Sequence, residues 1–217
     1  MTTAQFRRSM AAGIAFVVLF VVGVFVTFGN SPDLKHKDSD AVAAHKYVAK
    51  LSDSGSRTGL LIGAYLIVLA ALAFIWFTQG VRDRVASQPG GRLVGALGVL
   101  GAGAMAAGAM ASAVVPGAVS FGDEPVPADG DTIRVAMDLF FPFLFVVLGL
   151  TAAALVAVVA LRGEASLPSW LRYGGWLAVL GGIFAVLFLP MVLVLLWFLV
   201  FAILGLMSSR PERATPA

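Results

Sequence analysis

The sequence predicts an all-α protein folded as a polytopic bundle of transmembrane helices. Hydrophobic residues make up 59% of its 217 residues and charged residues only 12%, whereas a soluble domain averages about a quarter charged. The apolar residues gather in runs near the roughly 20 residues that a helix needs to cross a bilayer. The length suits a single membrane domain over residues 1–217 with no separate soluble domain.

Six apolar segments are expected to form the spanning helices. The first follows Arg7 and Arg8, and the third consists almost wholly of Gly, Ala, Val, Leu and Met. In chain order, the predicted spans cover about residues 11–28, 59–77, 93–115, 135–161, 173–188 and 191–207. The two longest connections between them, residues 30–58 and 117–133, are predicted to form outer loops.

The first span has the basic start and apolar middle that are also typical of a secretory signal peptide. It ends in Val-Thr-Phe-Gly-Asn at residues 26–30, which contains no small-x-small cleavage pattern. Because further spans follow, we interpret this segment as a helix that is retained.

The final apolar stretch, residues 173–207, is too long for one ordinary spanning helix and has Pro190 at its middle. Proline removes a backbone donor and breaks or kinks a helix. We therefore expect two short helices joined by a tight turn near Leu189 and Pro190. One long, kinked and tilted helix is the alternative.

Basic residues near span ends favour the cytoplasmic side. If the final stretch is a hairpin, one side of the membrane holds nine arginines, which are Arg7, Arg8, Arg82, Arg84, Arg92, Arg162, Arg172, Arg210 and Arg213. The other side then holds the six remaining basic residues and an acidic second loop. This distribution predicts a plasma-membrane (cell inner membrane) protein with both termini in the cytoplasm.

The first outer loop is expected to contain a short helix lying on the membrane surface. Ser39 or Asp40 can cap this helix, which would run through about Leu51. Val42, Val48 and Leu51 would form its thin apolar side.

Asp138 is the only acidic residue in or near the edge of a predicted span. An ionisable group in the bilayer is costly and marks a candidate functional site. Arg134 lies four residues earlier, on the same helical face. We favour an ion pair at the outer end of the fourth helix, and a relay for protons or cations or a contact for an anionic ligand is the alternative.

Several kinds of site are excluded by composition. The chain has no cysteine, which rules out disulfides, iron–sulfur clusters and cysteine nucleophiles. Its two histidines, His36 and His45, lie outside the apolar spans, which rules out bis-histidine haem within the membrane. They lie among aspartates in the first outer loop, but the spacing fits no metal-site template and nearby lysines would repel a cation. No metal and no cofactor are predicted.

Small residues at helical spacing allow close approach between membrane helices. The residues concerned are Gly103, Ala107 and Gly108 in the third predicted helix, and Gly174, Ala178 and Gly182 in the fifth. We interpret them as packing positions within the monomer, and an interface between subunits is the alternative. Among the large aromatics, Tyr65 and Trp197 are expected to pack inside the bundle.

Three motifs carry a resemblance to other sequences. They are Ser-Asp-Ala-Val-Ala-Ala-His at residues 39–45, Ile-Trp-Phe-Thr-Gln-Gly-Val-Arg-Asp-Arg at 75–84 and Leu-Pro-Ser-Trp-Leu-Arg-Tyr-Gly-Gly at 167–175. With them the chain resembles a set of uncharacterised small actinobacterial multi-pass membrane proteins of unknown function. The resemblance implies a membrane topology and assigns no functional residues.

These observations favour a non-catalytic integral membrane protein, an accessory or scaffold subunit of a membrane complex. Acid–base or metal catalysis needs convergent ionisable groups, and the sequence places none at membrane depth, so no enzyme is predicted. The alternative function is a transporter or binding protein for a small molecule or ion, using the outer end of the fourth helix. The expected partners are membrane lipid and another membrane protein or a second copy of the chain, with no nucleic acid.

Overall fold

The computed structural model describes residues 2–33, 39–85, 91–113, 135, 138–162, 168–187 and 189–208. Over these ranges the chain forms helices and turns and no strand, which confirms the all-α class. Within the same ranges, five helices are long and apolar enough to cross a membrane. The number of crossings and their direction stay predictions at this point.

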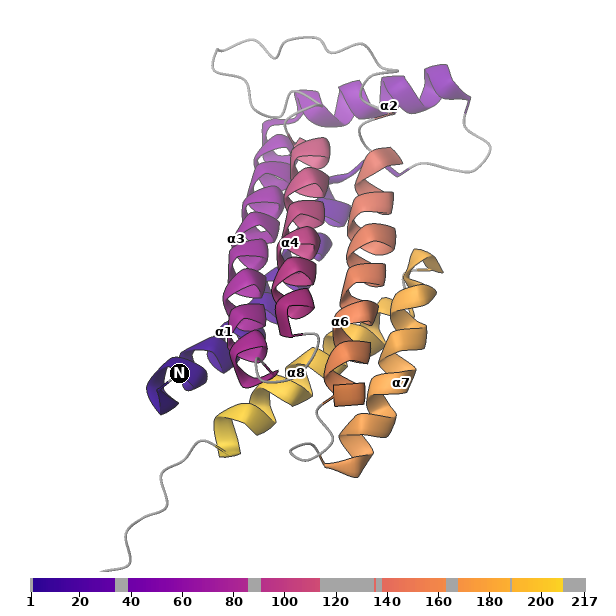
Figure 1. Ribbon diagram of the computed structural model, residues 1–217. Helices are drawn as coiled ribbons and strands as arrows, with labels where there is room; N and C mark the ends of the chain where they lie inside the picture. Colours follow the sequence, from indigo (N-terminus) through magenta and orange to yellow (C-terminus); the bar gives the residue numbers. More distant parts are fainter. Residues whose placement is uncertain are drawn as a thin grey trace, which may run out of the picture.

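Three long helices make one side of the bundle (Figure 1). α1 (Thr3–Asn30) packs against α3 (Ser54–Val85), and α3 packs against α4 (Gly91–Ala113). α1 begins with a capping box, in which the Gln5 N–H donates to Thr2 Oγ1 and the Thr2 N–H donates to Gln5 Oε1. α1 and α3 run beyond both limits of their predicted spans because helical hydrogen bonding continues into the polar flanks.

The fourth long segment contains a π-helical turn. Its helical residues are described without a gap from Asp138, pass through η1 (Pro142–Val147) and continue as α6 (Leu148–Arg162). Pro142 has no N–H to donate to a carbonyl four residues back. The ladder is instead π-helical here, and the Leu148 N–H donates to the carbonyl of Phe143, five residues back.

The last two helices are separated by a break at the predicted position. α7 (Ser169–Ile183) is followed by the short 3-10 helix η2 (Ala185–Leu187), a turn that contains Pro190, and α8 (Met191–Ser208). α7 has only 15 residues, about 22 Å at helical rise, while the hydrocarbon core is about 30 Å thick. It is therefore not among the five helices of spanning length.

The turn between α7 and α8 lies well below the end of the bundle where α2 (Asp40–Ser52) is found (Figure 1). Gly182 contacts Gly149, which is eleven residues along its helix from Asp138, or roughly 16 Å. Met191 shares an apolar groove with Val24, six residues before α1 ends, or roughly 9 Å. Both contacts put the turn inside the length of the neighbouring helices.

α2 lies across the end of the bundle, nearly perpendicular to the long helices (Figure 1). Its buried face consists of Ala43, Tyr47 and Leu51, and Tyr47 and Leu51 pack on Leu60 of α3. The prediction of a short helix ending near Leu51 is confirmed, and its position on the membrane surface stays a prediction. Its predicted apolar side is wrong at Val42 and Val48, which are exposed. The face of α2 that packs on α3 is the one that carries Tyr47.

The core of the bundle is aromatic. The ring of Phe16 in α1 lies 4.7 Å from that of Phe74 in α3 and 6.0 Å from that of Phe198 in α8. Trp197 is buried at 4% exposure, as predicted, whereas Tyr65 is 64% exposed and the prediction that it packs inside is wrong. The pattern of apolar residues does not distinguish a lipid-facing position from a buried one, because lipid and the protein interior are both apolar.

Candidate functional site

Asp138 stands at the start of the fourth long segment and its side chain is exposed. The predicted partner, Arg134, lies outside the described residues, so the ion pair stays a prediction. The residue that the structure brings towards Asp138 comes instead from α2. It is Tyr47, on which the charge of Asp138 acts electrostatically.

Tyr47 is the feature of this end that sequence reasoning missed. Its side chain is only 6% exposed, and burial together with the negative charge of Asp138 raises the pKa of Tyr47 to about 12. The phenol is therefore neutral at physiological pH. The signal that could have found it is the spacing of Ala43, Tyr47 and Leu51 at successive turns of α2.

The histidines of the first outer loop do not form a metal centre in the described part of the chain. His45 is exposed on α2, and His36 lies outside the described residues. No group of three or more His, Cys, Asp or Glu side chains is placed to hold a metal ion among the residues that the structure describes.

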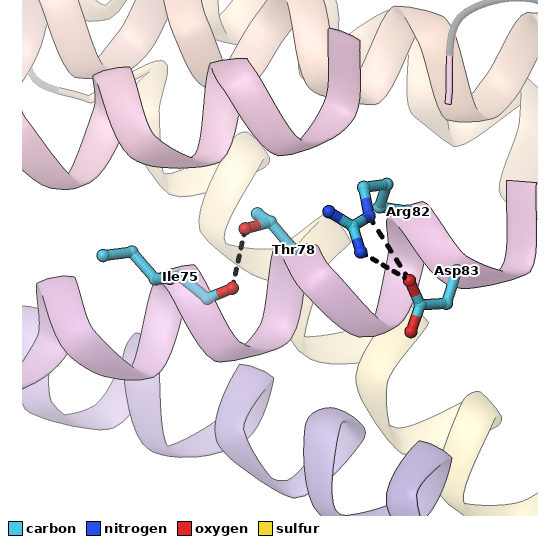
Figure 2. A network of polar contacts seen from close by, with 4 residues as sticks. All are labelled: Ile75, Thr78, Arg82 and Asp83. Atoms are coloured by element: carbon cyan, nitrogen blue, oxygen red, sulfur yellow. Dashed lines mark hydrogen bonds and ion pairs between the residues drawn. The ribbon is translucent and has the colours of Figure 1, made fainter. Parts of the chain in front are cut away.

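Apart from Tyr47 and Trp197, the buried side chains with a polar group in the described residues are Ser and Thr. Deep in the bundle, these hydroxyls donate to backbone carbonyls of their own helices. The bonds run from Thr27 to Gly23 (2.9 Å), Thr78 to Ile75 (2.9 Å), Ser112 to Ala109 (2.9 Å) and Thr151 to Val147 (2.8 Å). Figure 2 shows Thr78 directed at the carbonyl of Ile75. Such local bonding satisfies each hydroxyl without a ligand.

The opposite end of the bundle from α2 is rich in arginine. The described arginines there are Arg7, Arg8, Arg82, Arg84, Arg92, Arg162 and Arg172. Arg82 forms an ion pair with Asp83 at 3.0 Å (Figure 2), and both side chains are partly exposed. The guanidinium of Arg84 lies 4.9 Å from the ring centroid of Phe6, a cation–π contact.

The predicted packing positions divide into two groups. A Cβ at Gly108 would lie 2.9 Å from Leu144 Cγ, and one at Gly182 would lie 2.6 Å from the Gly149 carbonyl oxygen, so both glycines meet a neighbouring helix. A Cβ at Gly103 or Gly174 would meet no atom within 4 Å. Neither glycine therefore has a packing neighbour among the described residues, and Gly103 is exposed while Gly174 is half-buried. Ala107 is half-buried, between the two groups.

One further contact fixes α7 to α8. The Trp197 Nε1–H donates to the carbonyl oxygen of Leu171 at 3.0 Å, and this bond is buried. It joins residues 26 positions apart in the chain. Trp197 thus holds α8 against the start of α7.

Comparison with protein-family models, with curated proteins and with solved structures gave no match for this chain. The resemblance to small actinobacterial membrane proteins stays a prediction.

Proposed function

We propose that this protein is a non-catalytic accessory or scaffold subunit of a membrane complex, and that its partner covers the turn between α7 and α8. One observation carries the proposal. The turn is apolar and exposed, with Leu187 at 68% and Leu189 at 76% exposure, although it lies inside the length of the neighbouring helices.

The orientation of the chain follows from its charges. Because arginine near helix ends favours the cytoplasm, we assign the end that carries Arg82, Arg84 and Arg92 to that side. The α2 end, which carries Lys46 and Lys50 together with Asp33, Asp53 and Asp138, is then outside. Both termini are cytoplasmic in this arrangement, and the membrane is the plasma membrane.

In that orientation, α7 and α8 form a hairpin that turns back within the bilayer instead of crossing it twice. The turn has no charged residue between Phe184 and Met191, so nothing draws it to water. Its N–H groups make short-range bonds, such as Leu187 to Phe184 (3.0 Å) and Leu189 to Leu187 (2.7 Å). Non-helical backbone at membrane depth is tolerated where protein covers it or where it lines a water-filled cavity. The wholly apolar side chains of the turn favour protein.

The interior of the bundle supports the same function. The hydroxyls of Thr27, Thr78, Ser112 and Thr151 are satisfied by their own helices, and apart from Tyr47 of α2 the described residues bury no ionisable side chain. A transport path would need polar or hydrated groups along the bundle. Within the described residues, the bundle therefore presents an outward apolar surface and no ionisable group along the interior of its long helices.

Native mass spectrometry of the protein, extracted gently from its own membrane, tests this function. We expect a second protein at fixed stoichiometry. A lone chain, or a chain that carries one discrete small molecule, would contradict the accessory role and would favour a transporter or binding protein.

Binding of a small molecule or ion at the outer end of the fourth helix is the second candidate, favoured by the electrostatic coupling of Tyr47 with Asp138. In that case Asp138→Asn should abolish transport or binding while expression and the bundle stay intact. Asp33→Asn, which removes an exposed carboxylate from the same end, is the matched control. Unchanged activity in Asp138→Asn would exclude this candidate.

A further inference from the structure

A groove of about 820 Å³ runs between the end of α3 and the start of α4, at the arginine-rich end of the bundle. Its polar part is lined by Gln79, Arg82, Asp83 and Arg92. Its apolar part is lined by Ala96, Val99 and Leu100, which lie further along α4. The groove is thus charged near the end of the bundle and apolar towards the middle of the bundle.

Arg82 is held in place at the charged part. A Cβ at Gly95 would lie only 3.1 Å from Arg82 Cδ, so the arginine stem rests on α4 where the glycine leaves room. Its Nε and Nη2 donate to Asp83 Oδ1 at 3.3 and 3.0 Å. An arginine has five N–H donors, and this arrangement leaves Nη1, on the Gly95 side, outside the ion pair (Figure 2).

Arg92 supplies the second charge. It is exposed on α4 and makes no ion pair with the residues that the structure describes. Ala96 and Val99 follow it at spacings of four and seven residues, on one face of the helix. Val99 and Leu100 are both more than half exposed. The exposed surface of α4 is therefore charged at Arg92 and apolar further along the helix.

We propose that this groove binds an anionic phospholipid, with the phosphate at Arg82 and Arg92 and one acyl chain along Ala96, Val99 and Leu100. Two arginines and one aspartate leave a surplus of one positive charge, which matches the single negative charge of a phosphodiester. Arginine binds phosphate through charge-assisted, often bidentate hydrogen bonds, and basic pockets between helices at the cytoplasmic side suit anionic headgroups. The proposal rests on the membrane orientation given above and not on the protein partner.

The test uses the full-length purified protein, delipidated and then offered phosphatidylglycerol, phosphatidylcholine or soluble glycerol phosphate. Native mass spectrometry counts the lipids that stay bound. We expect one retained phosphatidylglycerol per chain and a preference of about tenfold over phosphatidylcholine, because two charge-assisted contacts are at stake. Glycerol phosphate should not displace it, because it lacks the acyl chain.

The double variant Arg82→Gln/Arg92→Gln should lose the preference, and Arg7→Gln/Arg8→Gln, which removes the same charge from the same end, should keep it. Ala96→Trp blocks the acyl path at unchanged charge and should also release the lipid. Equal binding of both phospholipids by the wild-type protein would overturn the proposal without any variant. Equal loss of the preference for phosphatidylglycerol in the two double variants would show that the preference depends on overall surface charge and not on this groove. Displacement of the lipid by glycerol phosphate would show that the groove binds a soluble anion.

Discussion

Gly149 of α6 and Gly182 of α7 face each other with no side chain between them. A Cβ at Gly149 would lie 2.8 Å from the Gly182 carbonyl oxygen, and one at Gly182 would lie 2.6 Å from the Gly149 carbonyl oxygen. The two backbones therefore touch at the point where α7 ends. This contact fixes the depth at which the hairpin turns, on which the proposed function depends.

Replacing Gly182 should separate α6 from α7. We expect Gly182→Leu to lower the free energy of unfolding by roughly 1–3 kcal/mol, the usual cost of overpacking a close contact. Gly174→Leu, in the same helix but with no neighbour within 4 Å, is the matched control and should change stability by less than about 0.5 kcal/mol. Reversible unfolding in mixed detergent micelles measures both, and equal losses would refute the contact.

Raising the pH should loosen α2 through Tyr47. The pKa of Tyr47 is raised from 10.0 to about 12, so its stabilising neutral form is fully present below pH 10. The contribution is lost as pH rises from about 10 to about 12. Tyrosinate absorption should show a late titration step that Tyr47→Phe removes. Asp138→Asn should move that late step to lower pH, since the carboxylate charge no longer opposes ionisation, and an unmoved step would contradict the coupling.

The buried bond from Trp197 to Leu171 should contribute measurably to stability. Trp197→Phe keeps most of the ring but deletes the donor, so the expected cost is roughly 1–3 kcal/mol for the lost bond and the space left behind. Trp76→Phe provides the comparison, because Trp76 is 64% exposed. Unfolding curves of the two variants that coincide would show that this bond does not hold α7 to α8.

The depth of the hairpin can be mapped with single cysteines, since the chain has none of its own. A cysteine at Leu187 should resist a water-soluble maleimide in intact cells and in opened vesicles, because the turn lies in the bilayer. A cysteine at Ser39, just ahead of α2, should react from outside. Rapid labelling of Leu187→Cys from outside would show instead that α7 and α8 each cross the membrane.

The parts of the fold that depend on composition and helix breakers could be predicted from the sequence. The apolar runs, the short helix from Asp40 and the break near Pro190 belong to this group. Positions that depend on which face of a helix meets its neighbour could not. Tyr65 and Gly103 are exposed and Gly174 has no packing neighbour among the described residues, although their residue types suit a core, because lipid and protein interior are equally apolar.

The candidate site shows the same division. Asp138 stands out in the sequence because it is the lone acid near a span, but its neighbour Tyr47 is 91 positions away in the chain and only the docking of α2 brings them near each other. The groove beside Arg82 and Arg92 likewise depends on the absence of a side chain at Gly95. No spacing rule links residues across two helices before their packing is known.

Photo-crosslinking from the turn, in the native membrane, tests the central claim most directly. A photoreactive residue at Leu187 should capture one second membrane protein, while the same residue at Leu72, which is 59% exposed on α3, should capture lipid. Capture of lipid alone from both positions would contradict the proposal that a partner protein covers the turn between α7 and α8.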